Sequence, residues 1–141
     1  MQLTTDVSIA RSGELARVAE LYASVGYGGG VSAADLTLLA KAGGRLAGVV
    51  RLCGEADVTV LRGMQVHPEF QRQGIGRLLL ARCVPHLDER TAYCLPYGHL
   101  VRFYEQAGFE LAEPGELPPF LARRLAGYLA SGQQVVAMRR Q

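Results

Sequence analysis

The apolar residues near the start of the chain have the spacing of a helix that buries one face. Four of them follow the i, i+3, i+4, i+7 pattern: Leu15, Val18, Ala19 and Tyr22. Ser12 comes before this pattern and is a favoured residue at a helix N-cap. The preceding residues 7–9 are a short strand candidate. The pattern therefore predicts a strand and then a helix capped by Ser12.

The apolar runs in the middle of the chain are typical of a sheet. Residues 37–42 and 45–53 flank Gly43-Gly44, a glycine-rich pair that predicts a hairpin turn. Residues 58–66 form a longer run that is apolar on both faces, which indicates a buried strand. Gly63 interrupts this run, and a glycine inside a strand often marks a bulge or a close backbone approach.

The second half of the chain alternates between helical and extended patterns. Five elements are predicted there: a helix from Gly74 to about Pro85, a strand at 91–95, a helix at 100–107, a helix at 120–130 and a strand at 133–138. The 120–130 helix should bury four residues: Leu121, Leu125, Tyr128 and Leu129. Gly108 follows the 100–107 helix, as glycine commonly does at a helix end. A strand-rich middle with helices on both sides predicts one mixed α+β domain over residues 1–141.

Composition and charge narrow the function classes. The 141 residues are 49% hydrophobic and 20% charged, which suits one compact domain with a buried core. We find no apolar run long enough for a membrane span and no secretory signal, so we expect a cytoplasmic protein. The formal net charge is +2, without basic clusters interleaved with aromatic residues, so we expect no nucleic-acid partner.

The three cysteines lie inside apolar segments. They are Cys53, Cys83 and Cys94. An odd number at these positions favours small buried thiols over a disulfide framework or a metal site, and we expect no metal. Cys94 is a conceivable nucleophile, but no histidine is placed beside it in the sequence, so a buried thiol is the preferred interpretation.

The segment 64–79 predicts a phosphate-binding turn. It leads from a predicted strand through Gly74 and Gly76 into a predicted helix. Glycines let the backbone approach a ligand, and the first amide groups of a helix lack intrahelical partners and favour negative charge. Arg72 and Arg77 add two cations, so a pyrophosphate would meet backbone donors and side-chain charge together.

Other interpretations of this turn fit less well. A P-loop ends in Gly-Lys-Ser/Thr, whereas Gly76 is followed by Arg77 and Leu78. A dinucleotide fingerprint needs a third glycine where Leu79 stands. A plain connection, with glycines for geometry alone, does not need the paired arginines or the segment Val66-His67-Pro68.

Two motifs resemble those of a known family. The pattern Gln-x-x-Gly-x-Gly from Gln71, preceded by Val-x-Pro from Val66, resembles motif A of the GNAT acyltransferase superfamily, whose members bind the pyrophosphate of acetyl-coenzyme A (acetyl-CoA) on this turn. About thirty residues later, Phe103-Tyr104-Glu105-x-x-Gly108-Phe109 resembles motif B of the same superfamily. Two matches in the right order are more specific than either alone.

The resemblance implies a fold. The expected domain has a twisted six- or seven-stranded, mostly antiparallel sheet with helices on both faces. Its central strands, residues 58–66 and 91–95, should run parallel and splay apart. A bulge near Gly63 would open the sheet to receive the pantetheine arm of the cosubstrate. Dimers are common in the superfamily, so a homodimer is a possible state of this chain.

The resemblance also implies acetyl-CoA as the cosubstrate. Backbone groups of three residues would bind the pantetheine arm and the acetyl carbonyl: Met64, Gln65 and Val66. Seven residues of the turn would bind the pyrophosphate: Gln71, Arg72, Gln73, Gly74, Ile75, Gly76 and Arg77. In this superfamily an amine attacks the thioester directly. Tyr104 stands where motif B places the proton donor, and an unperturbed phenol, with a pKa of about 10, is protonated at neutral pH and can protonate a thiolate.

The chain departs from the superfamily pattern at the general base. Many members carry a glutamate at the position of Val60 or Ala92, and an asparagine that contacts the cofactor is replaced by Tyr97. Three other side chains are candidates for the base, beside ordered water: His99, Glu55 and Asp57. Each of them is more often a surface or packing residue than a base.

The sequence therefore predicts an N-acetyltransferase that transfers an acetyl group from acetyl-CoA directly to an amine. The acceptor is a small amine or a protein amine that the sequence does not identify. The loop 26–30, with Tyr27, and the segment 97–99 are expected acceptor walls because loops carry specificity. The alternative is a non-catalytic acyl-CoA-binding sensor or regulatory module, since no superfamily base is present.

Overall fold

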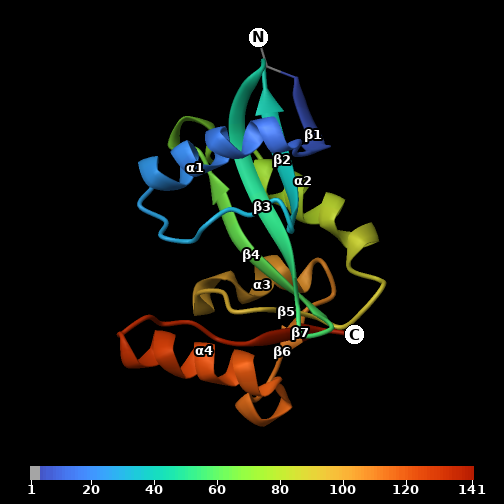
Figure 1. The fold of residues 1–141 in the computed structure, drawn as a ribbon, viewed down its shortest axis with the longest axis vertical. Helices are drawn as coiled ribbons and strands as arrows, with labels where there is room; N and C mark the ends of the chain where they lie inside the picture. Colours follow the sequence, from blue (N-terminus) through green and yellow to red (C-terminus); the bar gives the residue numbers. More distant parts are fainter. Residues whose placement is uncertain (1–3) are drawn as a thin grey trace.

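The computed structural model describes residues 4–141 as a seven-stranded sheet flanked by four α-helices (Figure 1). The strands are β1 (Thr5–Ile9), β2 (Leu36–Ala42), β3 (Arg45–Glu55), β4 (Val58–Val66), β5 (Ala92–Cys94), β6 (Glu110–Leu111) and β7 (Met138–Arg140). The α-helices are α1 (Leu15–Ser24), α2 (Ile75–Cys83), α3 (Val101–Glu105) and α4 (Pro119–Ala130). The strand order is β1-β2-β3-β4-β5-β7-β6. This architecture confirms the predicted mixed α+β fold.

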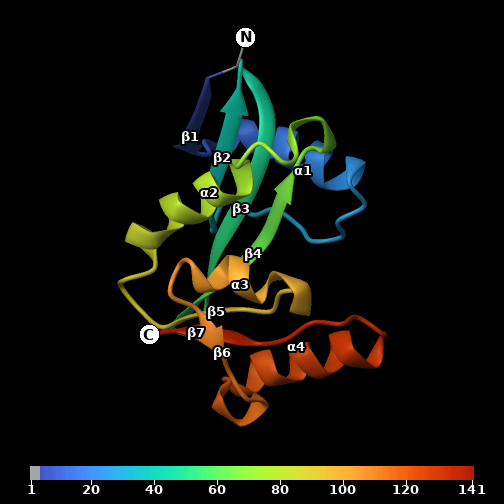
Figure 2. The ribbon, with the colours of Figure 1, turned by 180° about the vertical axis from the view of Figure 1, so that it is seen from behind.

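The helices cover the two faces of the sheet in pairs. Helices α1 and α4 lie on the face seen in Figure 1, and α2 and α3 lie on the face seen in Figure 2. Each face has its own packing: α2 and α3 contribute Leu79 and Tyr104 to the largest core cluster. On the other face, α1 packs Val18 against β2 and β3, and α4 packs Leu121 in a separate cluster.

The central strands β4 and β5 run parallel and then separate, as predicted. They pair at only three positions, from Thr59 opposite Ala92 to Leu61 opposite Cys94. β5 ends at Cys94, whereas β4 continues to Val66. The peptide groups of β4 beyond Leu61 therefore have no strand partner on the β5 side.

Gly63 forms the predicted bulge in β4. The register with β3 pairs Val49 with Gln65 and Arg51 with Arg62, so one residue of β3 faces two of β4. Gly63 has a φ of +66°, in the left-handed region that favours glycine. A bulge increases the local twist of a strand and bends it. The bend falls just after the last position at which β4 pairs with β5.

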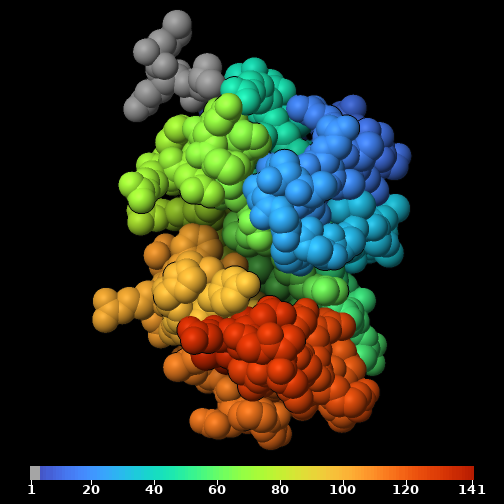
Figure 3. Space-filling view, turned by 90° about the vertical axis from the view of Figure 1, so that its left-hand side faces the viewer, coloured from blue at the N-terminus to red at the C-terminus, as the bar shows by residue number. Residues whose placement is uncertain are grey.

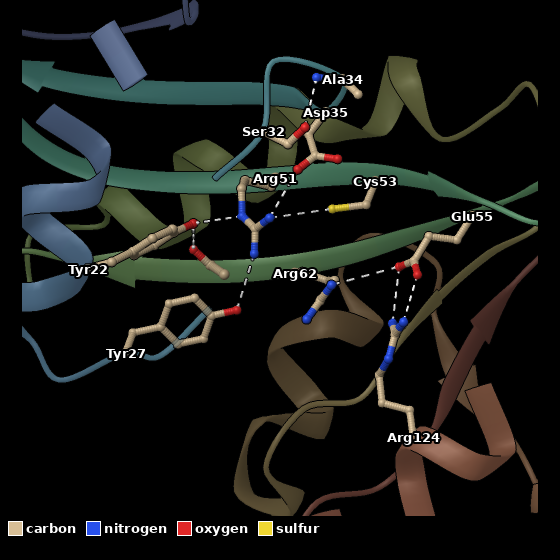
Figure 4. Close-up of polar contacts among 11 residues, drawn as sticks. Tyr22, Tyr27, Ser32, Ala34, Asp35, Arg51, Cys53, Glu55, Arg62 and Arg124 are labelled. Carbon is tan, nitrogen blue, oxygen red and sulfur yellow. Dashed lines mark hydrogen bonds and ion pairs between the residues drawn. The ribbon is translucent and has the colours of Figure 1, made fainter. Parts of the chain in front are cut away.

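A buried hydrogen-bond network fixes this bulge from the α1 side (Figure 4). The Tyr22 hydroxyl donates to the Gly63 carbonyl at 2.8 Å, and Arg51 Nε donates to the same hydroxyl at 3.2 Å. The Arg51 side chain is only 4% exposed and forms an ion pair with Asp35 at 3.0 Å. Because a buried charge is costly without partners, these contacts hold β2, β3, β4 and α1 in one arrangement. Burial raises the pKa of Tyr22 to about 12, so its hydroxyl remains a donor.

Three sequence expectations about helix ends and faces are wrong. Ser12 does not cap a helix, because a 3-10 turn at Ser12–Glu14 comes first and the Glu14 side chain accepts from the Arg11 amide. Ala19 is exposed and Leu21 is buried in its place, since the helix meets the sheet along a slightly rotated stripe. Leu129 is 50% exposed because it lies beyond the sheet near the end of α4.

The last strand also differs from its predicted range of 133–138. β7 is Met138–Arg140, and Val135 makes only an isolated bridge to Tyr97. The neighbouring segment contains Pro96, which has no amide hydrogen to donate to a ladder. Regular pairing therefore begins only where β5 and β6 flank the chain.

Two other expectations, the glycine-rich hairpin turn and the buried cysteines, agree with the structure. Gly43 and Gly44 both have positive φ, at +59° and +81°, as the predicted glycine-rich hairpin turn requires. The three cysteines are free and buried. Within residues 4–141, no helix is long and apolar enough to cross a membrane. Over the same residues, the structure has no group of three or more potential metal-ligating side chains.

The bulge geometry predicts an unequal cost for two glycine substitutions. A Cβ at Gly63 would lie 2.2 Å from the Tyr22 hydroxyl, whereas nothing lies within 4 Å of a Cβ at Gly44. Both positions have positive φ, so Gly44→Ala is the matched control for backbone strain alone. We expect Gly63→Ala to lower the free energy of unfolding by about 3 kcal/mol and Gly44→Ala by about 1 kcal/mol, measured by urea denaturation. Equal losses would contradict the packing of Tyr22 on the bulge.

Candidate active site

A cavity of about 520 Å³ lies where β4 leaves β5. In Figure 3 the green surface of β4 is visible in the hollow between α1, in blue, and α4, in red. Its walls come from four parts of the chain: the bulged end of β4, the loop between α1 and β2, the segment from β5 into α3, and α4 with the segment that follows it. The splay of the two central strands therefore creates an opening at the centre of the sheet.

The structure brings four of the predicted site residues together in this cavity. Met64 and Gln65 come from the β4 bulge, Gln71 from the turn that follows, and Tyr104 from α3. The remaining predicted residues do not line it. Val66 ends β4, and residues 72–77 continue from Gln71 as a turn and the first part of α2.

The turn before α2 has free backbone donors at its surface. Gly74 is the N-cap with a φ of +81°, and Leu78 donates the first α-helical bond, to the Gly74 carbonyl at 3.0 Å. The amides of residues 74–77 therefore have no helical acceptor. Arg72 also has a positive φ, of 64°, which is uncommon for a residue other than glycine. The side-chain amide of Gln71 donates through Nε2 to the Val66 carbonyl at 3.2 Å and ties the turn to the end of β4.

The side chains of the turn divide between solvent and core. Arg72, Gln73 and Arg77 are exposed, so their polar groups are accessible to a ligand. The Ile75 side chain is 3% exposed and packs in the core, so only its backbone can contact a bound molecule. This arrangement suits an anion at the N-terminus of α2.

Tyr104 presents an unpaired hydroxyl to the cavity. Its ring is held edge-on by Phe103 and Phe109, with ring centroids 5.0 and 6.2 Å away. Its hydroxyl makes no hydrogen bond with any of residues 4–141. Burial raises the pKa of Tyr104 well above the ordinary range of a phenol, so the hydroxyl is protonated at neutral pH. Tyr104 can therefore donate a hydrogen bond into the cavity.

Cys94 also lines the cavity but is a poor nucleophile. Burial raises the pKa of its thiol well above the usual value for cysteine. The reactive thiolate is therefore disfavoured at neutral pH.

The three candidate bases lie in different environments. Both oxygens of Glu55 accept from Arg124, at 3.0 and 2.6 Å, and this pairing lowers the pKa of the Glu55 carboxyl. A carboxylate with a lowered pKa and occupied oxygens is a weak base. Asp57 lies in the turn between β3 and β4, outside the cavity. Only His99 lines the cavity, where it stacks on Tyr97 with ring centroids 6.0 Å apart.

Two arginines of the cavity were missed by the sequence analysis. Arg62 stands on β4 just before the bulge, and Arg124 comes from α4. The only signal for Arg62 is a charged residue inside an apolar strand. Arg124 had none, because its partner Glu55 is far away in the sequence. Arg51 was missed for the same reason, since its partners Tyr22 and Asp35 come from other elements.

Comparison with solved structures gives three informative neighbours. N-acetylglutamate synthase from Neisseria gonorrhoeae, solved with coenzyme A and N-acetyl-glutamate, has a TM-score of 0.70 and 21% identity, covering 99% of this chain and 35% of that one. Ribosomal-protein-S18-alanine N-acetyltransferase from Escherichia coli has a TM-score of 0.68 and 19% identity, covering 97% and 93%. A putative N-acetyltransferase from Lactobacillus plantarum has a TM-score of 0.70 and 18% identity, covering 98% of both chains.

These neighbours share the fold at low identity. The chain spans about a third of the length of the N-acetylglutamate synthase. A search of curated proteins found no match. The model of the acetyltransferase (GNAT) domain matches residues 33–111, which is more than half of the chain and contains both motifs and the β4 bulge. The chain therefore belongs to the GNAT acetyltransferase family.

Proposed function

We propose that this protein is an N-acetyltransferase that transfers the acetyl group of acetyl-CoA directly to an amine. The observation that carries the proposal is the continuity of three features: the unpaired edge of β4, the donor-rich turn before α2, and the cavity that contains Tyr104. Two neighbours, the N-acetylglutamate synthase and an aminoglycoside 6'-N-acetyltransferase, were solved with coenzyme A bound, which supports the choice of carrier.

In this proposal the cosubstrate follows the chain from the turn to the bulge. The pyrophosphate binds the amides of residues 72–77, with Arg72 and Arg77 as counter-charges. The pantetheine arm runs along the free edge of β4 and pairs with the peptide groups of residues 64–66. The thioester then lies at the bulge, beside the Tyr104 hydroxyl.

The reaction replaces the C–S bond of the thioester by a C–N bond, and it needs two proton transfers. The amine nitrogen attacks the thioester carbonyl carbon, the C–S bond breaks, and Tyr104 protonates the departing thiolate. A backbone amide at the bulge stabilises the oxyanion that forms on the carbonyl. The acceptor arrives as an ammonium and transfers its proton to His99, directly or through water. Histidine is a side chain that commonly accepts protons in enzymes, and His99 lines the cavity. Holding both reactants in line supplies much of the rate.

A second candidate function is a non-catalytic acyl-CoA sensor. One observation favours it: among the described residues that line the cavity, none is a carboxylate. A sensor would bind acetyl-CoA but release no free thiol with any amine. A thiol-release assay with pooled amines therefore separates the two functions.

The acceptor is not fixed by the fold. The neighbours' names include a synthase of N-acetylglutamate, an enzyme for an alanine of a ribosomal protein and an aminoglycoside-modifying enzyme. These acceptors differ in size and charge, so the acceptor of this chain must be inferred from its own cavity.

The proton-donor role predicts the effect of Tyr104→Phe. Removing the hydroxyl should lower kcat by about 100-fold, because general acid catalysis typically contributes that much or more. The dissociation constant of acetyl-CoA, measured by calorimetry, should stay within about twofold of the original. Unchanged turnover would remove Tyr104 from the mechanism.

The phosphate site predicts different effects for two exposed arginines of α2. Arg77→Gln, in the first turn, should weaken acetyl-CoA binding about tenfold by removing a charge-assisted contact. Arg82→Gln, in the last turn of the same helix, removes the same charge far from the turn and should have no effect. Neither change should affect binding of S-acetylpantetheine, which has no pyrophosphate. Equal effects of both variants on acetyl-CoA would contradict the site.

The role of His99 as proton acceptor predicts a pH-dependent loss. In His99→Gln only free amine present in solution can react, so kcat/KM should fall about 100-fold at pH 7. The deficit should shrink as pH rises, because the fraction of free amine grows. His86→Gln, an exposed histidine after α2, is the control. A deficit that is constant with pH would show that His99 acts only through packing.

A further inference from the structure

The charged side chains of the cavity are two guanidinium groups from different elements. Arg62 comes from β4 and Arg124 from α4, and both approach the same carboxylate, Glu55 (Figure 4). Glu55 itself does not line the cavity, and neither does any other carboxylate of residues 4–141. The group therefore carries one excess positive charge toward the bound molecule.

The two arginines are not equally satisfied. Arg124 uses both of its terminal nitrogens on the two Glu55 oxygens. Arg62 Nη1 lies 3.9 Å from Glu55 Oε2, which is too long for a hydrogen bond, and its side chain is 30% exposed. Over residues 4–141, Arg62 makes no side-chain hydrogen bond. Its planar set of donors is therefore available, and a carboxylate is the group that fits such a fork in two parallel bonds.

The position of Arg62 relates this charge to the reaction centre. Arg62 directly precedes Gly63, and the thioester is proposed to lie at the bulge, beside Tyr104. Arg62, Gly63 and Met64 line the same cavity, so a carboxylate bound at Arg62 lies in the same cavity as the acetyl carbon. An acceptor that binds there and reacts at the bulge must carry its amine close to its carboxylate.

We propose, on the basis of the proposed acetyltransferase function, that the acceptor is a free α-amino acid whose carboxylate binds Arg62. A polyamine would bring further positive charge to a cavity that already has an excess of it. A protein N-terminus has no carboxylate beside its amine, because that carboxyl group is part of the next peptide bond. The two products are the N-acetyl amino acid and free coenzyme A.

The same contact assists the loss of a proton from the acceptor. In a free amino acid the carboxylate stabilises the neighbouring ammonium. Once the carboxylate is paired with Arg62, this stabilisation of the ammonium is weakened. A site of this kind needs a weaker base than one that binds a simple amine. This accounts for a cavity whose described lining lacks a carboxylate base.

The test compares common L-α-amino acids with their α-carboxamides, which keep the amine and side chain but lose the negative charge. With acetyl-CoA, kcat/KM from thiol release should be about 100-fold higher for the preferred amino acid than for its carboxamide. Binding is measured separately by calorimetry, titrating each compound into protein saturated with coenzyme A. Heat should be released with the preferred amino acid and not with its carboxamide.

Variants of single arginines test whether the preference for the amino acid over its carboxamide depends on Arg62. Arg62→Gln should lower kcat/KM for the amino acid about 100-fold through KM, reduce its preference over the carboxamide to near one, and leave acetyl-CoA binding unchanged. Arg62→Lys keeps the charge and should restore part of the preference. Arg123→Gln, at an exposed position of α4 beside Arg124, is the control and should change neither. A purely structural role of Arg62 would not alter the preference.

The possible failures are distinguishable. No thiol release with any amino acid, carboxamide or simple amine would reject the proposed function, while calorimetry would still test the acceptor site. Equal turnover or equal heat with amino acids and carboxamides, or stronger turnover of polyamines, would overturn the inference about Arg62 and leave the acetyltransferase function intact.

Discussion

The hydrogen bond from the Tyr22 hydroxyl to the Gly63 carbonyl is the contact on which the site depends. It holds β4 in a bulge at the position where pairing with β5 stops. Arg51 holds Tyr22 in turn, and Asp35 compensates the buried charge of Arg51. β5 ends at Cys94 while β4 bends at the bulge, and the free edge of β4 and the cavity lie where the two strands separate. A buried polar network, rather than the apolar core, thus defines the opening in the sheet.

Arginines serve three different purposes in this chain. Arg51 is buried and structural, Arg72 and Arg77 are exposed at the turn before α2, and Arg62 and Arg124 line the cavity. These arginines differ in how many of their side-chain donors already have a partner in the protein. Arg51 has partners on every side, whereas the turn and Arg62 keep donors free. The small net charge of the whole chain hides this distribution, because 13 acidic residues offset most of the 15 basic ones.

Much of the fold follows from local sequence. Strand β4 forms over the predicted residues 58–66, because its apolar residues favour a buried strand. Gly63 and the two hairpin glycines have the positive φ that a bulge and a turn require. The turn before α2 is also evident from the sequence, because its glycines and arginines are close together in the chain. The pairing of Glu55 with Arg124, and the short β7, depend on segments brought together only by folding. No spacing rule reveals such contacts, which is why the charged part of the cavity was missed.

In the proposed function the free edge of β4 and the turn before α2 together bind acetyl-CoA. A titration followed by amide ¹H–¹⁵N NMR tests this binding residue by residue. We expect the largest shifts on addition of acetyl-CoA at the amides of residues 64–66 and 72–77, with the β1–β2 edge unchanged. Unchanged amides in both segments at saturating acetyl-CoA would rule out this binding site.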